Sequence, residues 1–498
     1  MAMGIMVVTP ATGFAQTWMV GMRAGGSVER LPAELSQTRF VDGTTLPQTD
    51  IEAAFRLRLS GEVSGRPTDR LGLTFGIDTG LFELSDRGVQ MDRREVSPQV
   101  RDTLLLGRVF AELQLGRNGV VALKAGRYRP QIGAGTVFDA YAFGAQVDVD
   151  LSLLALAPLS FKAQVLLPDG TFTALRKTSP LIDFQVEYRL GWFSRIKGVA
   201  SIFIDTNSEL ADPVRSAMFK GSNAGLNDIV DGLVQLLNVS EDVAAASLLD
   251  WIDTNIEVQT KGPVVWTGLM AELGDQQYSI QLTALGAFGA LKLKTRPTQA
   301  RIEQFENQAL SPRLQASFAD RFNAAATVPI AAFFGEITTR LAVGEHLQLG
   351  TFALALSGDE GIRLADNPQI GSFLGLSPLL PRTAVFFGGT FGPDQATPTA
   401  FSLAPDASGI LAAGAHSTAL WRQLTLRLDV AAMSSLVPSR FTGGRFYGVE
   451  IDFSGTLSVV DDWALFIDGG ILWPGDFFDD EMPAVQFVAG IQIFTESR

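Results

Sequence analysis

Residues 449–459 read VEIDFSGTLSV, a run in which apolar residues alternate with polar or acidic ones. In an extended chain, successive side chains point to opposite faces, so Val449 and Ile451 lie on one face while Glu450 and Asp452 lie on the other. A strand with one apolar face and one charged face is typical of a barrel wall between lipid and water. This stretch therefore predicts a strand that crosses a membrane.

The same alternation recurs along the whole chain. Bacterial barrels have even strand numbers, so we expect an all-β, transmembrane antiparallel β-barrel of about 18 strands, within a range of about 16 to 20. A soluble β-sandwich or propeller is the alternative, but here the apolar faces are hydrophobic in nearly every element. Candidate strands lie near residues 17–28, 51–63, 70–80, 103–115, 119–128, 143–152, 158–168, 182–192, 195–205, 263–273, 276–290, 323–343, 347–357, 383–391, 408–416, 418–432, 445–459, 462–473 and 483–494.

Composition agrees with a membrane protein. Hydrophobic residues make up 46% of the chain and the mean hydropathy is +0.20. No charge-free apolar stretch reaches the length of a spanning helix, so the membrane interpretation rests on strands. The absence of Cys excludes disulfides and thiolate metal sites. A net charge of −14 argues against nucleic-acid partners.

The N-terminal residues 1–15 resemble the remnant of a secretory signal. A short apolar run around Val7 precedes Gly13 and Ala15, the small residues that a signal peptidase reads. We therefore expect residues 16–498 to form a single barrel in the outer membrane of a Gram-negative bacterium.

Two segments break the strand pattern, at about residues 206–261 and 295–322. Leu226, Ile229 and Leu233 have the spacing of a helix face, and the second segment is also amphipathic. We expect helical inserts on the outer side of the barrel. Two arrangements remain open: a cap on the rim, or a plug that folds into the lumen.

Orientation follows if the C-terminus is periplasmic, because short turns then face inward and long loops outward. The segments at Val460 to Asp462 and at His416 to Ser417 are then predicted to be periplasmic turns. Aromatic girdles are expected at Trp421 and Trp463 on the inner side and at Tyr447 and Trp473 on the outer side.

Charged residues on the polar faces are predicted to line the lumen, where rings of fixed charge bias which solutes enter. These residues are Arg56, Arg58, Arg108, Glu112, Asp148, Asp150, Asp183, Glu187, Arg189, Arg427, Asp429, Glu450, Asp452 and Asp468. Acids and bases are interleaved, so the predicted lumen is of mixed charge.

A family resemblance is visible in two regions. Residues 123–129 read LKAGRYR and are followed by Gly133, by Phe138 and Asp139, and by residues 146–148, which read QVD. This passage resembles one in the alginate-export family of outer-membrane barrels. The closing hairpins resemble that family at Gly448, Glu450, Asp452, Gly469, Gly470 and residues 474–478.

The resemblance implies an 18-stranded, monomeric, porin-like barrel that passes a polyanionic polysaccharide between luminal arginines. The positions that match this role are Arg108, Arg127 and Arg129. The many predicted luminal acids depart from a purely cationic path.

Residues for catalysis or metal binding are few. His346 and His416 are the only histidines, which leaves little for a catalytic triad or a zinc site, and we expect no enzyme activity, cofactor or metal. The acidic group Asp476, Asp479, Asp480 and Glu481 has two interpretations, a Ca²⁺ site in an outer loop or a solvated run of charge.

The sequence therefore predicts an outer-membrane channel for passive or export passage of polar solutes, including an anionic saccharide or polysaccharide. A plugged structural or adhesin-type barrel is the main alternative, and an enzyme barrel ranks last. Expected partners are outer-membrane lipid, the barrel assembly machinery and polar or anionic solutes, with the chain acting as a monomer.

Overall fold

The computed structural model describes residues 15–30, 52–78, 82–85, 88–91, 106–155, 157–168, 179–211, 214, 256–297, 325–359, 369–376, 383, 385–386, 400–402, 407–439, 442–460, 462–478 and 482–496.

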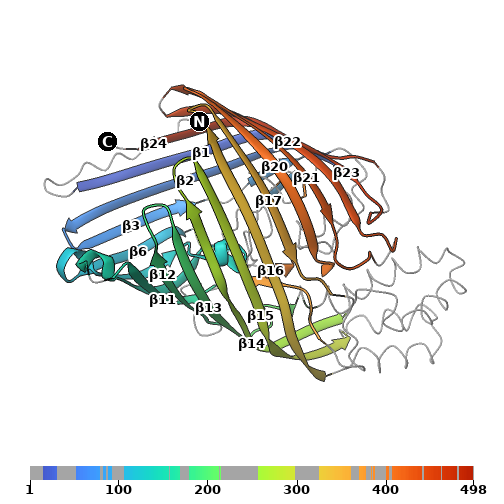
Figure 1. Ribbon diagram of the computed structural model, residues 1–498, viewed down its shortest axis with the longest axis horizontal. Coiled ribbons are helices and arrows are strands. Elements are labelled where there is room, and N and C mark those ends of the chain that lie inside the picture. The colour runs from blue at the N-terminus through green and yellow to red at the C-terminus, as the bar shows by residue number, and fades with distance from the viewer. Residues whose placement is uncertain are drawn as a thin grey trace, which may run out of the picture.

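One antiparallel sheet curls into a closed barrel (Figure 1). The sheet has 20 strands; β4 (Phe82–Ser85) and β5 (Gly88–Met91) form a short hairpin beside β2, and the other 18 form the ring. The ring closes because β1 pairs with both β2 and β24. Its strands are β1 (Ala15–Arg30), β2 (Glu52–Thr68), β3 (Leu71–Asp78), β6 (Leu106–Leu115), β7 (Val121–Tyr128), β10 (Ala142–Asp150), β11 (Leu159–Leu167), β12 (Leu181–Arg189), β13 (Arg195–Asp205), β14 (Ile256–Gly274), β15 (Tyr278–Pro297), β16 (Ala325–Val343), β17 (Leu347–Leu356), β20 (Ile410–Trp421), β21 (Leu424–Ser434), β22 (Phe446–Val460), β23 (Trp463–Pro474) and β24 (Ala484–Glu496). The predicted all-β barrel of about 18 strands is confirmed.

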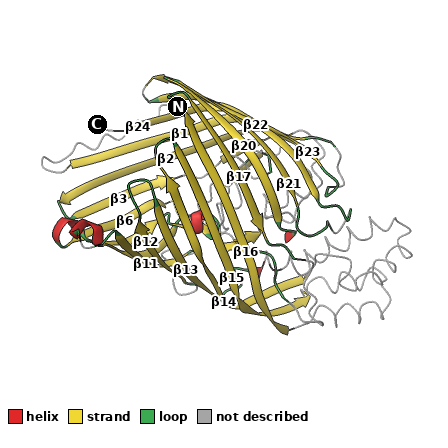
Figure 2. Cartoon of the chain, in the orientation of Figure 1, coloured by secondary structure: helices red, strands yellow, loops and turns green. Residues whose placement is uncertain are grey.

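The remaining described elements are small. They are the short strands β8 (Gln131–Ile132), β9 (Phe138–Asp139), β18 (Leu374–Leu376) and β19 (Ala400–Ser402), and the single-turn helices η1 (Arg117–Gly119), η2 (Gly133–Gly135) and η3 (Leu151–Leu154), drawn in red in Figure 2 where they are visible. Among the described residues, no helix is long and apolar enough to span a membrane.

The two ends of the barrel differ in the length of their connections. Short connections join β2 to β3, β6 to β7, β10 to β11, β12 to β13, β14 to β15, β16 to β17, β20 to β21 and β22 to β23, and they all lie at one end. The longer connections lie at the other end. Because outer-membrane barrels keep short turns in the periplasm, we name these the inner and outer ends.

Two sequence predictions of strands are wrong. Residues 408–416 and 418–432 were predicted to flank a turn at His416 and Ser417, but β20 runs through both residues and ends at Trp421. Two strand partners, on β17 and β21, hold His416 in the wall, so the local turn signal is overridden. A strand was also predicted at 383–391, but Val385 and Phe386, the two consecutive described residues in that range, lie in a bend.

The predicted helical inserts fall mostly outside the described residues. One margin of each is strand: residues 256–261 begin β14 and residues 295–297 end β15, so these strands are longer than predicted. At the other described margin of the first insert, Ala211 and Val214 are helical. The predicted signal remnant, apart from Ala15 in β1, also lies outside the described residues.

Aromatic side chains mark the barrel rims largely as predicted. Trp421 and Trp463 are each 50% exposed at the inner end, and Trp473 is exposed near the outer end. Tyr447 is the exception, because it is fully buried inside the barrel. A bulge at Gly448, whose φ is 137°, shifts the alternation of β22 there.

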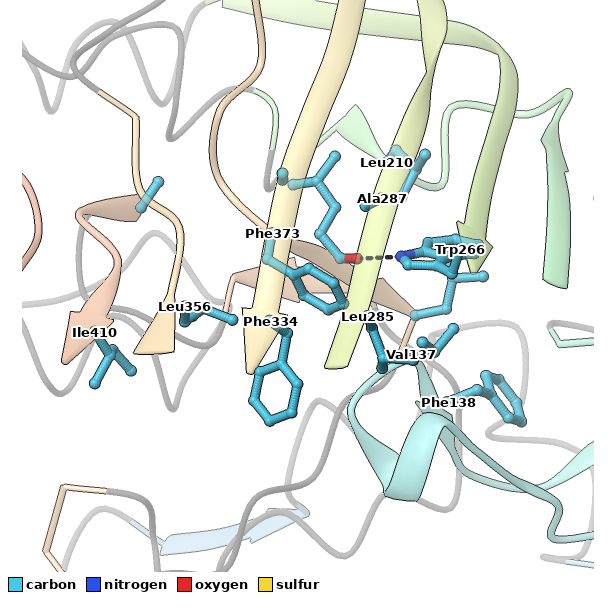
Figure 3. Close-up of a cluster of buried hydrophobic side chains, with 14 of the residues drawn as sticks. Val137, Phe138, Leu210, Trp266, Leu285, Ala287, Phe334, Leu356, Phe373 and Ile410 are labelled. Atoms are coloured by element: carbon cyan, nitrogen blue, oxygen red, sulfur yellow. Dashed lines mark hydrogen bonds between the residues drawn. The ribbon is translucent and has the colours of Figure 1, made fainter. Parts of the chain in front are cut away.

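Parts of several connections fold inward and fill the outer half of the barrel, including Leu210 between β13 and β14 and Phe477 between β23 and β24. We call residues 129–141, between β7 and β10, the first inward segment, and residues 369–376, between β17 and β20, the second. Figure 3 shows Val137 and Phe138 of the first and Phe373 of the second packed against wall residues such as Trp266. The buried apolar core of this protein therefore lies inside its barrel.

Candidate permeation path

The inward-facing wall changes character along the barrel axis. In the outer half it presents buried apolar side chains, including Trp266, Leu285 and Phe334, to the two inward segments. In the inner half it carries charged and amide side chains. The inward face is thus charged toward the inner end of the barrel and apolar toward the outer end.

Lys124, on β7, is held between two aromatic rings of the lumen wall. Its ammonium nitrogen lies 3.9 Å from the ring centre of Phe110 and 4.8 Å from that of Tyr128. Glu112 of β6 is its direct cross-strand partner. A cation is thereby fixed in the lumen beside two flat apolar faces.

A buried amide and carboxylate network follows on the next strands. Asp183 accepts hydrogen bonds from Gln164 (2.8 Å), Gln185 (2.8 Å) and Ser201 (2.7 Å). Next to it, Lys162 of β11 is the cross-strand partner of Asp148 on β10. A buried polar group that keeps its hydrogen bonds loses little free energy when it leaves water. A bonded network of this kind is also rigid, so it fixes the shape of the wall.

The inner mouth is lined by a linked group of charges. Glu187 contacts Arg189 at 3.2 Å, Lys197 at 3.7 Å and Arg195 at 3.8 Å. Arg195 also contacts Glu272 at 2.8 Å, which extends the group to β14. Arg195 and Lys197 each contact an acid on a neighbouring strand, whereas Arg189 contacts Glu187 on its own strand.

The wall made by β21, β22 and β23 is more acidic. Arg427 donates two hydrogen bonds to Asp429, of 2.7 and 2.6 Å. Asp452 is the direct cross-strand partner of Asp429, and Asp468 lies on the same face of β23. In strand order, this wall lies across the ring from the β11 region that carries Lys162.

Glu450 holds part of a connection against the wall. Its carboxylate is fully buried and accepts hydrogen bonds from the Thr383 hydroxyl (2.8 Å), the Phe386 amide (3.0 Å) and the Val385 amide. A carboxylate can accept several such bonds at once, which suits it to fasten a backbone turn. Glu450 therefore acts in the packing of the outer half.

The register places most of the predicted residues on the inward face. Arg108, Glu112, Asp148, Asp150, Glu187, Arg189, Arg427, Asp429, Glu450, Asp452 and Asp468 share that face with the buried Asp183. Arg56 and Arg58 lie on β2 opposite Gly25 and Arg23 of β1, and their side chains are outside the described residues. Their part in permeation stays a prediction.

Arg127 and Arg129 do not line the inner passage. Arg127 pairs in register with Val109 and Phe143 on the outward face, and its guanidinium carbon lies 5.6 Å from the Tyr141 ring centre. Arg129 lies past the end of β7, in the first inward segment, where its Nε contacts Asp139 at 2.6 Å. The role carried over from the resemblance thus fits Arg108 alone.

Several luminal charges were missed from the sequence. They are Glu62, Lys124, Lys162, Arg195, Lys197 and Glu272. Strand alternation could have identified these residues. Each one either lies an even number of residues from a luminal residue on its own strand or is the cross-strand partner of a luminal residue on the next strand.

The outer acidic group contains one structural residue. Asp476 Oδ1 accepts hydrogen bonds from the amides of Arg445 (2.9 Å) and Phe446 (2.6 Å), and the other three acids lie outside the described residues. In the part of the chain that the structure describes, no cluster of three or more His, Asp or Glu side chains is arranged to hold a metal ion.

The outer surface of the barrel is an apolar belt. Its exposed residues include Phe75, Phe184, Leu269, Phe333 and Leu428, each on the face opposite the luminal charges. A soluble protein would not expose so continuous an apolar surface, whereas lipid accepts it, and a closed barrel leaves no strand edge unpaired in the bilayer. The chain is therefore an outer-membrane protein of a Gram-negative bacterium.

No protein-family model matches the chain, and no curated protein is similar to it. Among solved structures, the outer membrane protein opdK of Pseudomonas aeruginosa is 10% identical, with 97% of this chain and 98% of that chain covered and a TM-score of 0.46. OccK5 (OpdH) of the same organism is 6% identical at a TM-score of 0.47, and Acinetobacter baumannii OccAB4 is 8% identical at 0.46, each with 97% and 98% coverage.

Proposed function

We propose that this chain is an outer-membrane channel for small polar solutes. The observation that supports it best is the inner passage, where cations and acids on adjacent strands form cross-strand pairs: Lys124 with Glu112, Lys162 with Asp148, Arg195 with Glu272. A barrel of this strand number is wide enough to hold water unless it is filled. Charged walls are costly without water beside them, so the inner passage is hydrated.

The pairing of charges bears on the solute. Fixed cations beside fixed acids attract polar groups of either sign but do not give the passage one strong charge. Small polar, zwitterionic or weakly charged solutes therefore suit it better than a highly charged polymer.

A more specific proposal is that the solute is an anionic saccharide, and Lys124 supports it. Its ammonium group can contact a carboxylate, and the half-buried Phe110 and the buried Tyr128 hold that group in place on the lumen wall. Passage of a long polysaccharide has less support, because the two inward segments occupy the outer half of the lumen.

The alternative, a plugged barrel without transport, is supported by that same apolar filling. Swelling of liposomes that contain the protein separates the two. A channel should admit neutral and acidic monosaccharides, and Lys124→Gln should slow the acidic one more than the neutral one. No swelling with any sugar would favour the plugged barrel. Equal slowing of both sugars would leave the channel in place but remove the anionic saccharide.

A further inference from the structure

Three exposed lysines gather on the outward face of the barrel, near the outer ends of two neighbouring strands. Lys261 lies on β14, and Lys292 and Lys294 lie on β15. Lys261 and Lys292 are direct cross-strand partners. Like charges placed directly opposite each other repel, so this pair raises the electrostatic free energy of the folded protein. An anionic partner bound between the two lysines would remove that repulsion.

Their height along the barrel is fixed by the apolar belt below them. On the outward face of β15 the belt runs from Tyr278, which is 43% exposed, to Phe288, which is 49% exposed. Ten residues of a strand that rises about 3.4 Å per residue and tilts by about 40° span about 25 Å, the height of the apolar band of such barrels. The two aromatic rings therefore mark the two interfaces of the membrane.

Lys292 and Lys294 follow Phe288 by four and six residues on the same face. The same geometry places them about 10 to 15 Å beyond the outer edge of the hydrocarbon, and Lys261 at the height of Lys292. This is the level of the polar headgroups of the outer leaflet.

The direct cross-strand partners of the lysines include no acid. Lys292 pairs with Thr327 and Lys294 with Ala325 on β16, and Lys294 pairs with Gln259 on β14. Within the described part of the chain, no acid forms an ion pair with any of the three. The cluster therefore presents a net positive surface directly above a lipid-facing wall.

We propose that Lys261, Lys292 and Lys294 form a docking site for a phosphorylated lipid headgroup of the outer leaflet. The acyl chains of the lipid would lie along the apolar face of β15 that ends at Phe288, and the phosphates would lie among the three ammonium groups. Each lysine near a charged membrane surface adds to such binding.

Binding of a bis-phosphorylated lipid A to the purified full-length protein in neutral detergent tests the site. The variant K261Q/K292Q/K294Q should bind about tenfold more weakly or worse. The matched control R66Q/R70Q/R422Q removes the same charge from exposed positions near the inner end and should bind as the native chain does. K261R/K292R/K294R keeps the charge and should retain most of the affinity.

Three outcomes would overturn the proposal. An equal loss of affinity in the two glutamine variants would indicate general charge attraction. Equal binding of lipid A that lacks its phosphates, or full displacement of the lipid by millimolar inorganic phosphate, would show that the site does not recognise a phosphorylated headgroup. Heat-modifiable migration on gels confirms that each variant is folded. If the triple variant does not fold, K292Q with R422Q as its control makes the same comparison.

Discussion

The indole nitrogen of Trp266 donates a hydrogen bond of 2.9 Å to the backbone carbonyl oxygen of Leu374. Both residues are fully buried. The bond joins the wall strand β14 to the second inward segment, whose Leu376 amide in turn donates to the Val137 carbonyl of the first inward segment at 2.7 Å. The Trp266 side chain thus adds to the backbone bonds by which Ile370 of the second inward segment joins Pro329 and Ala331 of β16.

Trp266→Phe should loosen this attachment. The substitution leaves the Leu374 carbonyl buried without its donor, which costs about 1–3 kcal/mol of stabilising free energy. This loss weakens the attachment of the inward segments and leaves the hydrogen bonds between the barrel strands intact. We expect faster hydrogen exchange at Leu374 and Leu376 and an increased conductance, with native heat-modifiable migration. Trp192→Phe, at a residue that is 99% exposed in an inner turn, is the control and should change neither. Unchanged exchange in the Trp266 variant would show that other contacts hold the segments.

The barrel could be predicted from the sequence because its signal is local and repeated. Residues 449–459 alternate, and they form β22, with Ile451 39% exposed toward lipid and Asp452 buried toward the lumen. Alternation reports the two faces directly, since each strand separates lipid from water. It fails at Tyr447, where the bulge at Gly448 changes the face without any change in composition.

The filling of the outer half could not be predicted in the same way. Residues 129–141 and 369–376 have neither a 2.0 nor a 3.6 residue period, so nothing local distinguishes an inward connection from an external loop. Their buried state depends on wall residues far away in the chain, such as Trp266 and Phe334. For the same reason Arg127 was assigned to the lumen through a resemblance, while register with Val109 places it outside.

The two faces of β21 should differ in their tolerance of charge. Leu426→Arg places a cation in lipid and should lower the free energy of unfolding by about 2–4 kcal/mol if the residue lies near the midplane. Thr425→Arg places it in the lumen and should cost much less. The same contrast holds on β22 for Ile451→Arg and Ser454→Arg. Denaturant titration in detergent or lipid measures all four, and equal costs on the two faces would contradict the assigned register.

Ion selectivity should follow the luminal charges only. Arg108→Ala removes an inward cation that contacts Glu62 at 3.4 Å and should shift the reversal potential toward cations. Arg127→Ala, on the outward face, should leave it unchanged, so the double variant should behave as Arg108→Ala does. Asp429→Asn with Asp452→Asn should shift it toward anions. A shift caused by Arg127→Ala alone would contradict the placement of that residue.

The turn between β14 and β15 should respond to pH through Asp275. Its carboxylate accepts the backbone amide hydrogens of Tyr278 and Gln277, each at 2.8 Å, and these bonds lower the pKa of Asp275 below its usual value. The stabilisation is present above the pKa of the unfolded chain and is lost as pH falls through the lowered pKa of the folded chain. Amide exchange at Gln277 and Tyr278, corrected for intrinsic pH dependence, should therefore be less protected in acid, and Asp275→Ala should abolish that dependence.

Single-channel conductance of the purified, heat-modifiable protein in a planar bilayer tests the central claim most directly. A hydrated inner passage that continues past the inward segments predicts discrete conductance steps, with only weak preference between cations and anions because acids and bases are paired along the wall. Steps that grow in Trp266→Phe would locate the constriction at the inward segments. Folded protein that inserts but gives no steps, in the native chain and in Trp266→Phe alike, would contradict the channel and identify a plugged barrel.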